Sequence, residues 1–352
     1  MPELATAGYA AADRPPDADD WLAAAARTSW LPVEHACYDL PVDQAAAQLR
    51  VAAAMVDVLL ADGMPSAPGP DGAPLLDRHD VFNFALDCGW RRAVPVLGYR
   101  YAMRWLAAPI DELVERRAWQ VAIAGPTPAE VPELLLSAPE PERHGGRYVD
   151  ADARPVNTAI DGVRRMRLAA GETLRGHATV LGHHVPIRAP QIREAIADVL
   201  CADLRWAKLP LTLQTLPEVV ERLGYATCLT TSARLAHRLR SAGFEVTTHL
   251  GWLMGMLPAV HSWVEVRDED GCVKVADPVL ALLRRRLDAL EGVDAPSLRA
   301  RAIPAAEQLA NGLLTNRMLP TASSTQDPLA IDAAGTGRLV VPRFAPTTER
   351  AR

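Results

Sequence analysis

The pattern of apolar and polar residues changes its period once along the chain, at about Phe244. Before that point, apolar residues fall on one face of a helix, at Leu229, Ala233, Ala236 and Leu239. Thr227 is a suitable N-cap and Gly243 a suitable C-terminal stop, so the spacing predicts a helix that begins at Cys228.

After the change, apolar and polar residues alternate with a period of two. The stretches 244–250, 260–266 and 272–277 each predict a short strand. Asp268-Glu-Asp-Gly271 is a hairpin signal between the last two. One helix followed by an antiparallel meander predicts an α+β domain.

Upstream of this region the pattern is mostly helical. Residues 1–20 are rich in Ala, Pro and Asp and are expected to form a mobile leader, and 21–137 are expected to form a helical N-terminal domain. Its helices are predicted at about 20–26, 42–61, 80–88, 96–107, 110–124 and 129–137.

A polar stretch with Pro and Gly at 138–155 is interpreted as a linker. The following 156–300 are predicted to form the α+β domain, with further helices at about 157–170 and 191–207 and a less regular segment, 175–190, that could hold a strand. Residues 301–352 are assigned a C-terminal helix, an edge strand suggested at 338–344 and a tail.

Composition narrows the class of protein. The 352 residues are 49% hydrophobic and 23% charged, which is ordinary for a globular chain, and the net charge of −6 argues against nucleic acid or an anionic membrane as partner. The five cysteines are scattered and show no C-x-x-C spacing, so neither a disulfide framework nor a thiolate zinc site is indicated. No signal peptide or membrane span is recognised, and a cytoplasmic location is expected.

The candidate chemistry lies where the period changes. A thiol at a helix N-terminus meets the positive end of the helix dipole, which favours the thiolate of Cys228. His261 shares one face of its predicted strand with Trp263 and Glu265. If Arg267 pairs with Gly271 across the hairpin, His261 lies opposite Asp277, whose carboxylate would orient the imidazole.

These residues carry a family resemblance. Cys228 with its helix, the strand His261-Ser-Trp-Val-Glu-Val and the ending Val275-Ala-Asp-Pro278 resemble the transglutaminase-like family of papain-like thiol enzymes, over about residues 216–280. The resemblance implies that Cys228 attacks an acyl carbonyl, that His261 moves the proton and that Asp277 orients His261. The Cys228 backbone N–H would stabilise the oxyanion, and Gln214 is a candidate for a second donor.

The resemblance implies a thiol-dependent acyl transfer, from a thioester or amide donor to an amine, in a bacterial biosynthetic pathway. A small molecule, a peptide or a carrier protein would supply the acyl group, and the helical region could serve as its platform. Two alternatives stay open: a peptidase or amidohydrolase with the same triad, and a silent binding module in which the three residues only pack.

Other motifs point to no further chemistry. His183-His184 would place adjacent side chains on opposite strand faces, and His144-Gly-Gly lies in the predicted linker without a nucleophile elbow. No phosphate-binding glycine motif and no calcium loop is present, so neither a cofactor nor a metal is expected.

Overall fold

The computed structural model describes residues 16–102, 111, 114–115, 117–124, 133–137, 147–149, 155–160, 163–169, 173–180, 183–253, 259–289, 313–314, 318–324 and 343–346. The chain divides into two compact units. Unit 1 comprises Met1–Tyr101 with Ala207–Pro210 and Leu290–Gly292, and unit 2 comprises Ala102–Trp206, Leu211–Ala289 and Val293–Arg352. The predicted linker at 138–155 therefore lies within unit 2, and most of the predicted leader lies outside the described residues.

Unit 1 is largely helical, as the sequence predicts, with a small antiparallel sheet in the order β1-β3-β2. Trp21 and Phe84 are fully buried at its centre, with ring centroids 5.4 Å apart. Its elements are α1 (Ala18–Arg27), the 3-10 helix η1 (Val33–His35), β1 (Tyr38–Pro41), α2 (Val42–Leu49), α3 (Ala53–Ala61), β2 (Ala67–Pro68), β3 (Pro74–Asp77), α4 (Arg78–Asp87) and α5 (Val94–Ala102).

The single helix predicted at 42–61 is wrong, because the chain breaks at Arg50. This residue adopts φ 55° and ψ 50°, the left-handed region, and ends α2. The helices α2 and α3 are consequently bent by 108°. Among the described residues no single helix is long and apolar enough to cross a membrane, although this bent pair meets the same test of length and composition.

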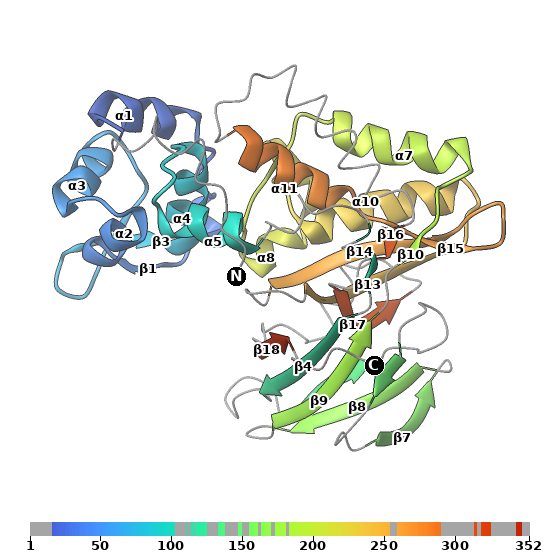
Figure 1. Ribbon diagram of the computed structural model, residues 1–352. Helices are drawn as coiled ribbons and strands as arrows, with labels where there is room; N and C mark the ends of the chain where they lie inside the picture. Colours follow the sequence, from blue (N-terminus) through green and yellow to red (C-terminus); the bar gives the residue numbers. More distant parts are fainter. Residues whose placement is uncertain are drawn as a thin grey trace. The chain divides into compact units, whose positions relative to one another are not determined.

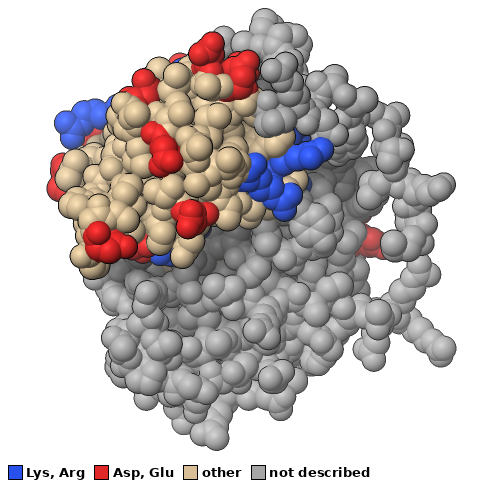
Figure 2. Space-filling model, turned by 90° about the vertical axis from the view of Figure 1, so that its left-hand side faces the viewer, with Lys and Arg blue, Asp and Glu red and all other residues tan. Residues whose placement is uncertain are grey.

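The surface of unit 1 is acidic. Residues 16–100 hold twelve Asp and Glu against six Lys and Arg. Figure 2 shows red acidic side chains spread over the described part of the visible face, with blue basic side chains near its margins. The whole chain carries the same net charge, −6, so the acidic and basic residues outside 16–100 balance each other.

The first half of unit 2 is a set of strands, and here the predicted helices are wrong over 117–124, 133–137, 157–160 and 163–169, whereas 111 and 114 are helical as predicted. Two antiparallel sheets run in the orders β18-β4-β9-β6 and β5-β8-β7. Their strands are β4 (Arg117–Ala124), β5 (Glu133–Ser137), β6 (Arg147–Val149), β7 (Pro155–Ile160), β8 (Val163–Ala169), β9 (Thr173–Val180) and β18 (Arg343–Pro346). Alanine and leucine favour helices weakly, and pairing between strands overrides that preference.

The second half of unit 2 confirms the predicted α+β architecture. An antiparallel sheet in the order β15-β14-β13-β17 packs against α10, the helix that Cys228 begins (Figure 1). The remaining elements are β10 (His183–His184), α7 (Pro190–Cys201), β11 (Arg205–Trp206), α8 (Leu211–Gln214), α9 (Pro217–Arg222), β12 (Tyr225–Ala226), α10 (Cys228–Ser241), β13 (Val246–Leu253), β14 (Ala259–Arg267), β15 (Val273–Ala276), α11 (Pro278–Ala289), β16 (Leu313–Leu314) and β17 (Met318–Ser324).

One apolar core joins α10 to its neighbours. Helices α7 and α10 and the sheet share a cluster of buried side chains that includes Ile192, Leu235, Leu239, Val264 and Val266. Burying side chains of this size stabilises the domain by about 1.5–3 kcal/mol each. The N-terminus of α10 is therefore held in a fixed place relative to β14, which matters for the site described next.

Candidate active site

Cys228 is the first residue of α10, and the residues before it build a firm helix start. Gly224 turns the chain with φ 70°, and β12 then pairs in parallel with β11. Thr227 forms a capping box with Thr230: the Thr230 amide donates to Thr227 Oγ1 at 3.2 Å, and the Thr227 amide donates to Thr230 Oγ1 at 3.0 Å. The helix offers no acceptor to the amides of Cys228 and Leu229, so they are available to an anion.

His261 lies on β14, and its ring is bonded to a carboxylate. His261 Nε2 is 2.6 Å from Asp277 Oδ2, and the two residues are 2% and 0% exposed. Asp277 directly follows β15, and its other oxygen, Oδ1, accepts the Val279 amide at 3.1 Å in the first turn of α11. The carboxylate thus caps a helix and orients an imidazole at the same time.

The predicted hairpin register is wrong by two residues, although the predicted pair forms. Val264 pairs with Ala276 and Arg267 with Val273, rather than Arg267 with Gly271. Asp277 therefore lies diagonally from His261 and not directly opposite it. A shift of two residues preserves the face on which each side chain projects, and a diagonal pair is still within reach of long side chains.

The electrostatics of His261 involve all three predicted residues. Burial lowers the pKa of His261, but the nearby Asp277 carboxylate and hydrogen bonds to Asp277 and Cys228 raise it to about 10. Because Nε2 faces Asp277, Nδ1 is the ring nitrogen left for the Cys228 thiol. The three predicted residues therefore interact: His261 is hydrogen-bonded to Asp277, and both Asp277 and Cys228 raise its pKa.

Exposure differs among the three residues in a way that suits a nucleophile. Cys228 is partly exposed, whereas His261 and Asp277 are buried. β15 pairs with β14 only over Val264–Arg267, so the part of β14 that holds His261 extends past the end of β15. A substrate would therefore meet the sulfur first, with the imidazole behind it.

A second His–carboxylate pair was missed by the sequence analysis. His249 lies opposite Trp263 on β13, and its Nε2 is 3.1 Å from Glu265 Oε2. The Trp263 ring stacks on His249 at 5.3 Å and on His261 at 6.1 Å. The alternation of 244–250 predicts the strand that carries His249. The register of β13 against β14, which the sequence does not specify, is what places His249 beside Glu265. Trp263 is 1% exposed, as expected of a core residue.

The other candidate residues lie on other elements or outside the described residues. Gln214 ends the short helix α8 and is partly buried, His184 is exposed, and His144 lies outside the described residues. Among the described residues, no cluster of three or more His, Cys, Asp or Glu is arranged to hold a metal ion.

Comparisons with known proteins place the chain in no family. No protein-family model matches it, and no curated protein matches its sequence. A solved structure, "a Putative Cysteine Protease from Cytophaga hutchinsonii", is 10% identical over 66% of this chain and 88% of its own, with a TM-score of 0.36. That similarity is too weak to support a function, so the chemistry is argued from the side chains themselves.

Proposed function

We propose that the protein is a transglutaminase-like thiol enzyme that transfers an acyl group to an amine through a thioester on Cys228. The observation that carries this proposal is the state of His261: its ring is hydrogen-bonded to buried Asp277, and its pKa is raised by Asp277 and by the Cys228 thiol. An imidazole held in this way accepts the thiol proton and keeps it, which leaves a thiolate as nucleophile.

The reaction would proceed in two acyl transfers. The Cys228 thiolate attacks the carbonyl carbon of an amide or thioester. The oxyanion that forms accepts a hydrogen bond from the Cys228 backbone N–H at the start of α10. The tetrahedral intermediate collapses to the thioacyl enzyme, and His261 gives its Nδ1 proton to the departing amine or thiol. An amine then attacks the thioester carbonyl while His261 takes the amine's proton. The carbon–sulfur bond breaks, the Cys228 thiolate is released, and the amide product leaves.

The same three residues would hydrolyse the thioester if water entered in place of the amine. We infer a donor of the acyl class, either free or carried by a peptide or carrier protein, used in a biosynthetic pathway. All five cysteines are free thiols, which agrees with work in a reducing cytoplasm.

The first test is the rate at which each cysteine reacts with iodoacetamide at pH 6.5, read by mass spectrometry. Cys37, Cys201 and Cys272 are exposed, whereas Cys228 is only partly exposed. An activated Cys228 should nevertheless react at least about tenfold faster than the exposed three. Burial raises the pKa of Cys88 to about 12, so Cys88 serves as the unreactive control.

The second test uses acyl thioesters with and without an added amine. The wild-type protein should form a Cys228 adduct and, with amine, an amide, and Cys228→Ala should form neither while unfolding at the same temperature. If the thioester is only hydrolysed in both conditions, the thiol mechanism stands but the proposed transfer to an amine is refuted. A Cys228 that reacts more slowly than the exposed cysteines, and forms no adduct, would make the fold a binding module.

A further inference from the structure

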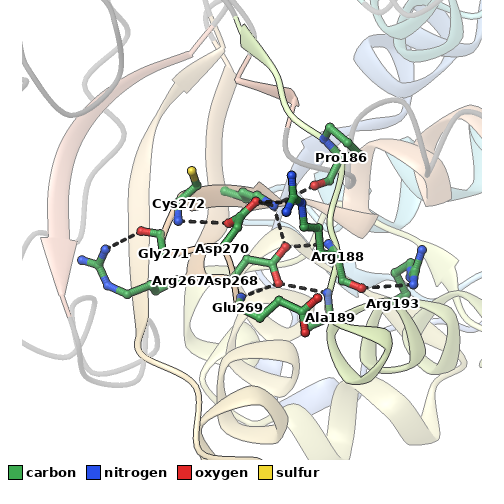
Figure 3. Close-up of polar contacts among 11 residues, drawn as sticks. Pro186, Arg188, Ala189, Arg193, Arg267, Asp268, Glu269, Asp270, Gly271 and Cys272 are labelled. Carbon is green, nitrogen blue, oxygen red and sulfur yellow. Dashed lines mark hydrogen bonds and ion pairs between the residues drawn. The ribbon is translucent and has the colours of Figure 1, made fainter.

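The turn of the β14–β15 hairpin lies beside the chain that enters α7 (Figure 3). A buried lysine, Lys274, forms hydrogen bonds to both segments. Lys274 is 2% exposed. Its ammonium donates to Asp268 Oδ2 at 2.6 Å, to Asp270 Oδ2 at 2.7 Å and to the Pro186 carbonyl at 2.7 Å. All three ammonium protons therefore have an acceptor.

Asp268 carries the fastening across to α7. Its carboxylate accepts the amides of Arg188 at 2.6 Å and Ala189 at 3.0 Å, and also that of Glu269 at 2.7 Å. Ala189 is the N-cap of α7, so Asp268 holds the two residues that lead into this helix. Burial raises the pKa of Asp268, but these amides and Lys274 lower it to about 2, so the carboxylate is charged at neutral pH.

A buried ion cluster of this kind adds little net stability, because the cost of removing charges from water offsets their attraction. Its best attested use is to specify one arrangement over another. The arrangement that the cluster could specify is the register of β15, whose sequence is Val273-Lys-Val-Ala276.

The apolar residues of β15 do not distinguish two registers. A slip of two residues places Val275 where Val273 was, and every side chain keeps its face. A slip in this direction would move Asp277 by about 6.6 Å along β14 and away from His261, whereas the opposite slip would place Asp277 directly across from His261. The slip away from His261 would also pull the Lys274 ammonium out of its three oxygens and move the Asp277 carboxylate into the place of Val275, which is 3% exposed.

We propose that Lys274, held by Asp268, Asp270 and the Pro186 carbonyl, is a positioning residue that sets the register of β15 and so delivers Asp277 to His261. Its effect on turnover rests on the proposed function. Its effect on the His261–Asp277 hydrogen bond does not.

The test compares Lys274→Met with Arg267→Met in the full-length protein. Arg267 lies on the same hairpin in an exposed ion pair with Glu245 at 2.7 Å, so its variant also removes one cation from this hairpin. The probe is the proton between His261 Nε2 and Asp277, observed by NMR in protein labelled with ¹⁵N-histidine and assigned by its absence in Asp277→Asn.

Lys274→Met should lose this resonance, while Arg267→Met should keep it. With an acyl thioester substrate, kcat of Lys274→Met should fall about 10²-fold with KM changed less than threefold, since a misplacement of about 1 Å costs that much. A wild-type protein without turnover would refute the proposed function, yet the resonance would still test the register.

Two results would overturn the proposal: an unchanged resonance in Lys274→Met, or its loss in both variants. If Lys274→Met does not fold, Asp270→Asn takes its place, because Asp270 is the less buried carboxylate partner of the ammonium. A weakened or faster-exchanging resonance in that variant supports the proposal, and a wild-type resonance overturns it.

Discussion

Replacing Asp277 with Asn should convert a charged His261 into a neutral one while leaving the fold in place. Asn has the same shape, and its carbonyl oxygen can still accept the Val279 amide that Asp277 Oδ1 accepts at 3.1 Å. The change removes the negative charge 2.6 Å from Nε2. Burial, which lowers the pKa of His261, then acts without its main opponent.

The magnitude follows from the pKa. In the wild-type protein the pKa of His261 is raised from 6.5 to about 10, which is worth on the order of 5 kcal/mol at about 1.4 kcal/mol per pH unit. Because the folded pKa is the higher one, this stabilisation is fully present below about pH 6.5 and is lost as the pH rises through about 10. In Asp277→Asn the loss between pH 7 and 10 should be absent.

Two measurements check this prediction. The first is the ring pKa of His261 from an NMR titration, which should fall below 6.5 in the variant. The second is the free energy of unfolding by urea between pH 6 and 10. Where a substrate is found, kcat should fall by about 10³- to 10⁴-fold, as in other triads that lose this charge. An unchanged ring pKa would refute the electrostatic account of the site.

Two further predictions concern unit 1. Asp80 is 1% exposed and its pKa is raised to about 7, mainly by burial, so the unit should lose stability as the pH rises from about 4 to 7; Asp80→Asn should flatten that dependence in urea unfolding, and an unchanged slope would contradict it. Arg50 ends α2 with φ 55°, so Arg50→Gly should stabilise the unit by about 0.5–1 kcal/mol in thermal unfolding, whereas Arg50→Ala should not.

The sequence predicted the region around Cys228 well because its signals are local. A capping residue, a helical face and a terminal glycine all lie within 227–243, and each describes its own neighbourhood. The alternation after Phe244 likewise locates the strands to within two or three residues. His261 and Asp277 were placed on one face because the predicted and the observed hairpin registers differ by two residues, and such a difference preserves the face of each side chain.

The rest was decided by contacts that a local pattern does not contain. The strands of 117–180 are held by partners far along the chain, such as β4 with β9 and β18, and their Ala, Leu and Arg residues favour helices when read alone. The register of β15 is the same problem on a smaller scale. Its Val-Lys-Val pattern keeps every side chain on its face after a slip of two residues, and the bonds of Lys274 to Asp268, Asp270 and Pro186 oppose that slip.

Asp277 shows why the site survives an error in the predicted register. One oxygen of its side chain accepts the Val279 amide in the first turn of α11, and the other is bonded to His261. The carboxylate is therefore fixed by a helix start as well as by a strand end. A residue with two such obligations has little freedom to turn, and the imidazole it holds has little freedom as well. Cys228 is held in a similar way, because it follows the capped turn between β12 and α10. Cys228 and Asp277 thus lie where an element begins or ends, whereas His261 lies within β14, and the packing of α10 on the sheet sets the distance from Cys228 to His261.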